Sequence, residues 1–146
     1  MKSIELWHKR ARPEPDDKAF NVQLGCHLEE IVEMLNSIES KYKNVGEFLL
    51  ARVTYDLNSL ATYLKNGEVT IELRNKREFL DSLADQIVTA IGAGYCAGMQ
   101  VPEAVEEVNR SNWSKFDQET GLPIFNEHGK IIKGAAYSAP DLKGLY

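Results

Sequence analysis

The chain has 146 residues, of which 43% are hydrophobic and 27% are charged, and its formal net charge is -5 at pH 7. This length and composition are typical of one globular domain with a core of its own. The acidic balance argues against broad contact with nucleic acid or with an anionic membrane surface. We therefore expect a single domain over residues 1–146, with a helical core at about 16–116 and a C-terminal arm at 117–146.

Neither the start of the chain nor its uncharged stretch predicts export or membrane insertion. The first ten residues become charged too early for a signal peptide, and the uncharged stretch 86–102 is too short and too polar to span a membrane. Cys26 and Cys96 lack the spacing of a zinc site, so we interpret them as small buried side chains. The expected location is the cytoplasm.

Two helices are predicted in the first half of the chain. The first follows the segment from Pro13 to Asp17, whose prolines and acids suit the approach to a helix N-terminus. Its expected core stripe comprises Leu24, Leu28, Ile31, Leu35 and Ile38. The second helix has the stripe Leu49, Val53, Leu57, Leu60 and Leu64. It should end at Gly67, which tolerates the positive φ that closes a helix.

Two more helices and a turn-rich tail follow. The third is expected from about Asn75 to Gly98, and Pro102 fits the first turn of the fourth. The apolar side of the third helix is predicted to comprise Leu80, Leu83, Ala84, Ile87 and Ile91. In the tail, 123–125 and 130–132 are expected to pair as a small hairpin across 126–129. The expected fold is all-α, a four-helix bundle with a turn-rich C-terminal arm.

An acidic cluster on the first helix comprises Glu29, Glu30 and Glu33, which crowd one side because carboxylates three or four residues apart are helical neighbours. Glu33 lies opposite the apolar stripe, where a helix usually faces solvent. A run of charged residues most often marks such a solvated face. However, Val22 and Cys26 precede these acids on the same side. Their presence indicates that another surface partly covers the cluster.

A second acidic line, Glu78, Asp81 and Asp85, borders the apolar stripe of the third helix. Carboxylates at the edge of a core face need a partner, and a divalent cation held by oxygens is an economical one. A di-iron bundle would require two Glu-x-x-His motifs, and the chain has only Glu5 with His8. No phosphate-binding loop or nucleophile elbow is present in the sequence, so covalent catalysis is unsupported.

Together with the run Glu107 to Lys115, these acidic clusters resemble the all-α nucleoside triphosphate pyrophosphohydrolases. That superfamily includes the MazG-type enzymes, the dimeric dUTPases and phosphoribosyl-ATP pyrophosphohydrolase. The tail segments 121–125, 129–134 and 140–142 are similar to the ending of small MazG-like and phosphoribosyl-ATP pyrophosphohydrolase-like proteins of phages and bacteria. The resemblance covers roughly residues 23–142.

The resemblance implies a metal site built from E-x-x-E on one helix and E-x-x-D on a later one. Glu30 and Glu33 match the first pair, and Asp85 matches the last acid of the second. Ser82 stands where the second pair would have its glutamate, so we expect Asp81 to take over. The implied cofactor is Mg²⁺, with Mn²⁺ as the alternative. The family's count of two or three ions is open here because of Ser82.

The implied reaction is attack of water on the α-phosphorus, which gives a nucleoside monophosphate and pyrophosphate. Glu29, beside the presumed ligand Glu30, is the candidate general base. The residues expected to hold sugar or phosphate are Asn109, Asn112, Lys115, Lys130 and Lys133. For these residues an exposed polar surface is the alternative interpretation.

The leading hypothesis is a magnesium-dependent pyrophosphohydrolase acting on a nucleoside or deoxynucleoside triphosphate. Phosphoribosyl-ATP is an alternative substrate. The alternative from another class is a catalytically silent helical module that binds a nucleotide or a partner protein, and the Ser82 departure favours it. A homodimer or homotetramer is expected, with neither nucleic acid nor a membrane as partner.

Overall fold

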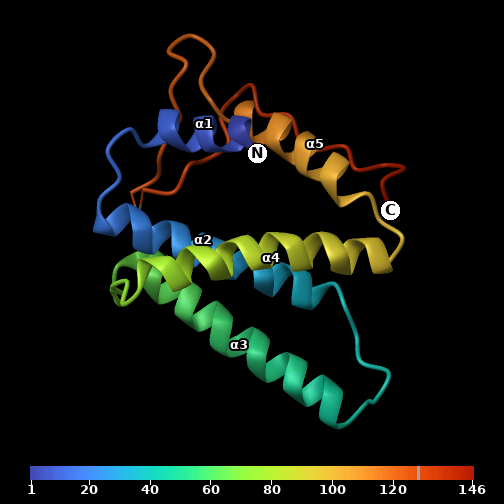
Figure 1. Cartoon of the computed structure of the whole chain (residues 1–146). Helices are drawn as coiled ribbons and strands as arrows, with labels where there is room; N and C mark the ends of the chain where they lie inside the picture. The colour runs from blue at the N-terminus through green and yellow to red at the C-terminus, as the bar shows by residue number, and fades with distance from the viewer. Residues whose placement is uncertain (128) are drawn as a thin grey trace. The chain divides into compact units, whose positions relative to one another are not determined.

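A computed structural model describes residues 1–127 and 129–146, and it confirms an all-α chain (Figure 1). Its five helices are α1 (Lys2–Ala11), α2 (Asp17–Asn36), α3 (Val45–Asn66), α4 (Lys76–Cys96) and α5 (Val101–Trp113). No strand longer than an isolated bridge occurs in these residues. His128, part of the expected hairpin turn, lies outside the described residues.

The helices belong to two compact units, each described by itself. The α1/α4/α5 unit comprises Met1–Glu14, Leu73–Phe125 and Ile131–Tyr146. The α2/α3 unit comprises Pro15–Glu72 and the hairpin tip Asn126–Lys130. The single domain and the four-helix bundle remain predictions.

Local capping sets the ends of α2 and α3. The Asp16 carboxylate accepts a hydrogen bond from the Ala19 N–H at 2.7 Å, so α2 begins at Asp17, the last residue of the segment predicted to precede it. Gly67 closes α3 with a φ of 75°, as predicted, and its N–H donates to carbonyls of the last turn. Both boundaries follow from residues adjacent in the sequence.

A glycine decides which face of α2 packs against α3. A Cβ at Gly25 would lie 2.8 Å from the Ala61 carbonyl oxygen, so the two backbones are too close for any larger residue. The buried apolar residues of this unit are Ala19, Val22, Val32, Ala61 and Leu64. The predicted stripe of α2 was centred on another face: its leucines and Ile31 are only partly buried, and Ile38 is exposed beyond the helix end. The face of α2 that carries small residues packs against α3, because small side chains allow close helix contact.

The segment after α3 is tied to α2 by Asn21, a buried polar residue. Its amide donates to the Asp17 carbonyl at 2.9 Å and to the Ile71 carbonyl at 3.2 Å, and its oxygen accepts from the Ile71 N–H at 2.7 Å. Because all of these groups are paired, burial of this amide costs little. The sequence alone gave no sign of this contact.

In the other unit, α1 is an additional helix that packs against α5. Trp7, Ala11 and Phe116 form a small core, and the Trp7 indole N–H donates to the Asn112 carbonyl at 2.9 Å. Ile4, Trp7 and Ala11 have helical spacing, but the pattern is short and was not interpreted as a helix from the sequence. Trp7 and Phe116 stack at 5.6 Å, so these two aromatic side chains pack within the protein.

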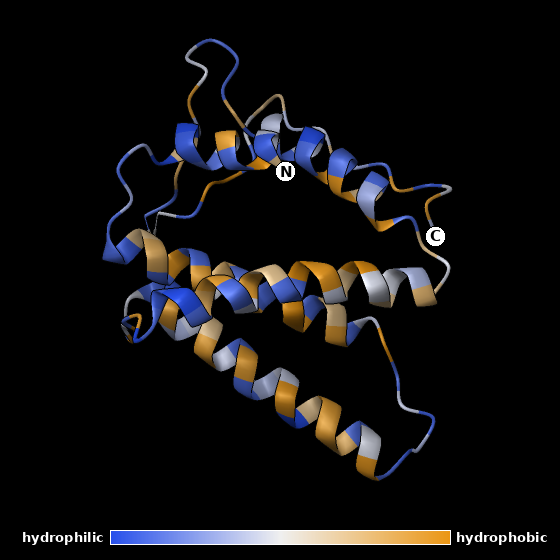
Figure 2. Ribbon diagram, in the orientation of Figure 1, coloured by the Kyte–Doolittle hydropathy of each residue, from blue (hydrophilic) through white to orange (hydrophobic). Residues whose placement is uncertain are grey.

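Helix α4 begins where predicted, because the Asn75 side chain accepts hydrogen bonds from the N–H groups of Arg77 and Glu78. Apolar positions recur along its length (Figure 2). None of its residues is buried within the described chain, and Leu80 is 69% exposed. Of the predicted stripe, Leu83 is partly buried, whereas Leu80, Ile87 and Ile91 are exposed.

The C-terminal arm contains the predicted hairpin. Phe125 and Ile131 form an antiparallel bridge, and the Ile132 N–H donates to the Ile124 carbonyl at 2.9 Å. Further along the arm, the Ser138 N–H donates to the Ser114 hydroxyl at 2.8 Å. No helix in the described residues combines the length and the apolar character needed to cross a membrane.

Candidate functional site

The candidate base Glu29 is held between two lysines. Its Oε1 accepts a hydrogen bond from Lys65 Nζ at 2.7 Å, and its Oε2 accepts one from Lys130 Nζ at 2.8 Å. Glu29 lies on α2, Lys65 on α3 and Lys130 at the end of the hairpin tip, so three segments meet at one carboxylate. We call these three residues the Glu29 cluster. Sequence reasoning named Glu29 and Lys130 separately and missed Lys65.

The charges of the Glu29 cluster set the proton affinity of its members. Burial raises the pKa of the Glu29 carboxyl, but the hydrogen bonds from Lys130 and Lys65 outweigh burial and hold that pKa below its usual value. The hydrogen bond to Glu29 raises the pKa of Lys130. With both oxygens engaged, Glu29 is a weak base. It is free to accept a proton only after at least one lysine has moved away.

Cys26 lies one turn before the Glu29 cluster on the same helix and is partly buried. Burial raises the pKa of its thiol, although Lys130 and Lys65 act in the opposite direction. A thiol with a raised pKa carries little thiolate at neutral pH and is a poor nucleophile. Cys26 is thus partly packed, whereas Cys96 is exposed, so the expectation of a buried side chain was wrong for Cys96.

The four candidate metal ligands are exposed carboxylates. Glu30 and Glu33 lie on α2, whereas Asp81 and Asp85 lie on α4 and belong to the other unit. None of them forms an ion pair with a cation among the described residues. Within those residues, no group of three or more His, Cys, Asp or Glu side chains is gathered for a metal ion. Each pair separately has the one-turn spacing that a shared ligand needs.

Two candidate binding residues on α5 contact α1. The Asn109 amide donates to the Ser3 hydroxyl at 3.0 Å, and the Trp113 indole N–H donates to the same hydroxyl at 3.1 Å. The backbone carbonyl of Asn112 accepts the bond from Trp7. Asn109 thus helps to hold α1 in place.

Lys115 and Lys133 are brought to one aromatic side chain. Lys133 Nζ lies 4.6 Å from the centroid of the Tyr137 ring. A side-chain hydrogen bond with Ser111 lowers the pKa of Tyr137, and the charges of Lys133 and Lys115 lower it further against the effect of burial. Sequence reasoning missed Tyr137, because it lies in the turn-rich tail with no motif around it.

The remaining charged residues of the α5 run bind the arm. Arg110 donates two hydrogen bonds to the Glu107 carboxylate, at 2.8 and 2.7 Å, and a third to the Ala139 carbonyl at 3.0 Å. Glu107 also accepts from the Asp141 N–H at 2.8 Å. These bonds, above all the one from Arg110, lower the pKa of Glu107 to about 2. We call Glu107 and Arg110 the arm clamp.

Comparison with known proteins adds no assignment to this geometry, since no family model, curated protein or solved structure matches the chain.

Proposed function

We propose that this chain is a magnesium-dependent nucleoside triphosphate pyrophosphohydrolase, which converts a nucleoside or deoxynucleoside triphosphate and water into the monophosphate and pyrophosphate. The observation that carries the proposal is the set of four exposed carboxylates, Glu30, Glu33, Asp81 and Asp85, which have no cationic partner among the described residues. Carboxylates paired at one-turn spacing on two helices are a donor set that suits hard divalent cations.

Glu30, Glu33, Asp81 and Asp85 would hold Mg²⁺, or Mn²⁺ in its place. The metal would neutralise negative charge on the triphosphate and would lower the pKa of the attacking water. Glu29 would accept the proton of that water once Lys130 has exchanged its carboxylate partner for a phosphate oxygen. This exchange unites two roles expected from the sequence, a base at Glu29 and a phosphate contact at Lys130.

The same proposal includes the four-helix bundle of this enzyme class, a cytoplasmic location and a homodimer or homotetramer. The oligomer is supported by exposed apolar side chains on α3 and α4, among them Phe48 at 63% and Leu80 at 69% exposure. A second copy would remove these side chains from water.

Two observations favour the catalytically silent module as a second candidate. Both oxygens of Glu29 are engaged by lysines, and Ser82 replaces the glutamate of the second acidic pair. A chain that binds a nucleotide without cleaving it would need neither a free base nor a complete ligand set. Phosphoribosyl-ATP remains an alternative substrate for the enzyme.

Pyrophosphate release from a panel of nucleoside and deoxynucleoside triphosphates, and from phosphoribosyl-ATP, tests the proposal. Release should require Mg²⁺ and should fall by about 10- to 100-fold or more in Glu33→Ala and Asp85→Asn, as expected when a metal site is weakened. Glu47→Ala, which removes an exposed acid at the start of α3, is the matched control and should retain full activity.

One result would decide against the enzyme, and another against the assigned metal ligands. Absence of release from every substrate, with the protein folded by circular dichroism, would favour the silent module. Metal-dependent release at an unchanged rate in Glu33→Ala and Asp85→Asn would refute the ligand assignment.

A further inference from the structure

The two lysines that hold Glu29 differ in how firmly they are fixed. The side chain of Lys65 is 18% exposed, whereas that of Lys130 is 44% exposed. Lys65 belongs to the last turn of α3, and Lys130 comes from the hairpin tip. Solvent and salt compete more strongly for the charges of an exposed ion pair than for those of a buried one. Of the two lysines, Lys65 is therefore the more permanent partner of the Glu29 carboxylate.

The packing of α2 against α3 sets the path of the Lys65 side chain. A Cβ at Gly25 would lie 2.8 Å from Lys65 Cγ and 3.3 Å from Leu64 Cβ, so the stem of Lys65 passes close to the α2 backbone at this glycine. Leu64 is 1% exposed and fixes this end of α3. A long side chain samples many rotamers in water, and packing of its methylene groups removes much of that freedom. The ammonium group of Lys65 is thus held at Glu29 by a constrained stem.

The two lysines also engage different oxygens of the carboxylate. Lys65 Nζ lies 2.7 Å from Oε1, and Lys130 Nζ lies 2.8 Å from Oε2. When Lys130 leaves, Oε2 loses its partner, while Oε1 stays bound and the orientation of the carboxylate remains restrained. A base with one anchored oxygen and one open oxygen is oriented before a water molecule arrives, which favours general-base catalysis.

We propose that Lys65 is the positioning residue of Glu29, which holds Oε1 throughout the reaction and leaves Oε2 to take the proton of the attacking water. The inference rests on the proposed function, since it assigns a role within that reaction. It deepens that function by giving the two lysines different tasks, a permanent anchor at Lys65 and an exchangeable partner at Lys130. In this role Lys65 touches neither substrate nor metal and acts through Glu29 alone.

The assignment is tested by a double-mutant cycle of Lys65→Met and Glu29→Gln in the full chain, with Mg²⁺ and each triphosphate that the wild type cleaves. Lys65→Met keeps a stem that can pack at Gly25 and removes the ammonium group. It should lower kcat by about tenfold or more with KM unchanged, as expected when a catalytic group is misplaced. Glu29→Gln should lower kcat by about 100-fold or more. The double variant should be no slower than Glu29→Gln.

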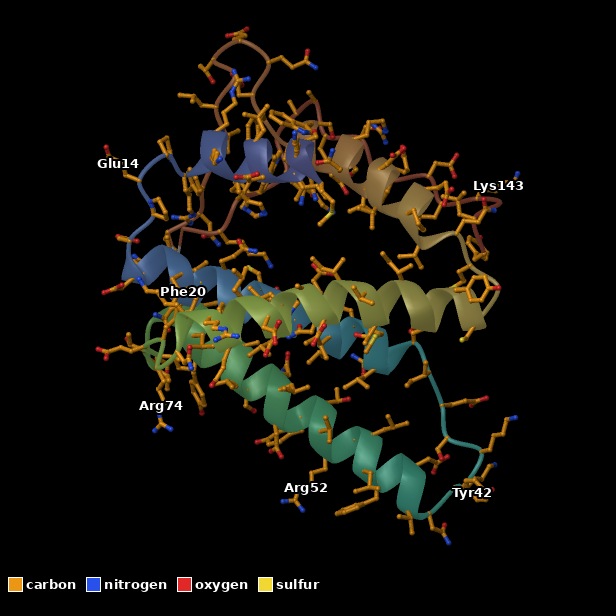
Figure 3. The ribbon with its side chains drawn as sticks, in the orientation of Figure 1. Glu14, Phe20, Tyr42, Arg52, Arg74 and Lys143 are labelled. Atoms are coloured by element: carbon orange, nitrogen blue, oxygen red, sulfur yellow. The ribbon has the colours of Figure 1, made fainter. Side chains whose placement is uncertain are left out.

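Further substitutions separate positioning from a loss of structure. Lys65→Arg retains a positive charge on a methylene stem and should restore kcat above that of Lys65→Met. Arg52→Met is the matched control on α3, since it removes a cation whose side chain is 69% exposed and extends away from the helix (Figure 3). It should keep the wild-type kcat and KM. Circular dichroism checks that each variant folds, and Lys65→Gln takes the place of Lys65→Met if that variant does not.

The outcomes separate this role from the reaction itself. A kcat loss in Lys65→Met that disappears in the Glu29→Gln background would support positioning. An unchanged kcat in Lys65→Met, or the same loss with and without Glu29, would overturn it while Mg²⁺-dependent hydrolysis by the wild type still stands. Absence of hydrolysis by the wild type would overturn the proposed function and, with it, the role of Lys65.

Discussion

Gly25 determines how closely α2 approaches α3. Its position would place a Cβ 2.8 Å from the Ala61 carbonyl oxygen and 2.8 Å from Lys65 Cγ. The carbonyl belongs to a helix backbone and cannot turn aside, and Lys65 is a member of the Glu29 cluster. A single small residue therefore supports both the packing of this unit and the ion pairs next to it.

We expect Gly25→Ala to destabilise the protein, although alanine favours a helix. Overpacking of this kind costs about 1–3 kcal/mol of the free energy of unfolding, which outweighs the gain in helix propensity of about 1 kcal/mol. Urea unfolding followed by circular dichroism measures the change.

Gly92→Ala is the matched control, because a Cβ at this position in α4 meets nothing within 4 Å. It should raise the free energy of unfolding by up to about 1 kcal/mol. Equal stabilisation by both substitutions would contradict the close approach of α2 and α3.

At the scale of elements, the arm clamp joins α5 to the C-terminal arm. Glu107 bridges the Arg110 guanidinium and the Asp141 N–H, while Arg110 reaches the Ala139 carbonyl. Glu107 and Arg110 of α5 thus hold the arm. The Ser138 N–H, which donates to the Ser114 hydroxyl, adds a second contact between the arm and the end of α5.

The arm clamp makes attachment of the arm dependent on pH. The pKa of Glu107 is about 2 in the folded protein, against an ordinary value of 4.5 for the unfolded chain. The contribution of Glu107 to stability is therefore fully present above pH 4.5 and is lost as the pH falls toward 2. Glu107→Gln should lower the thermal midpoint at neutral pH. The difference from the wild type should shrink between pH 4.5 and 2.

Glu106→Gln serves as the control for this pH series, since Glu106 is the exposed neighbour of Glu107 on the same helix. Its thermal midpoint should follow that of the wild type at every pH. A difference between Glu107→Gln and the wild type that persists unchanged to pH 2 would show that the carboxylate charge is not the cause.

At the scale of the whole molecule, the exposed apolar residues of α4 support association of copies. Leu80, Ile87 and Ile91 share one side of the helix and are 69%, 46% and 40% exposed. The Leu80→Lys/Ile87→Lys double variant should therefore reduce the mass of the particle measured by light scattering. Charges at these positions cannot be buried without a partner.

Ser82→Lys adds charge at a polar position of α4 and should leave the measured mass unchanged. If the wild type scatters as a stable monomer at working concentration, the homo-oligomer is wrong. The apolar side of α4 would then have to be covered within one chain.

Predictions from the sequence succeeded where neighbouring residues make the structure. Gly67 ends α3, Asn75 precedes α4 and Pro102 lies in the first turn of α5, each as expected. The prediction of the packed face of α2 was wrong, because it followed the spacing of the leucines and gave too little importance to Gly25. Helix α1 was missed because four apolar residues in ten make a weak pattern. The acidic pairs were located on their helices, and their metal remains a prediction.

By itself, the sequence determined the all-α class and most helix ends, because capping, glycine geometry and apolar spacing act within a few residues of chain. Only the tertiary structure decided the partners of the candidate site residues. Glu29 meets Lys65 and Lys130 across 36 and 101 residues of sequence, and the arm brings Ser138 to Ser114 across 24 residues. Contacts of this kind depend on how closely helices pack and where a tail docks, which no local pattern encodes.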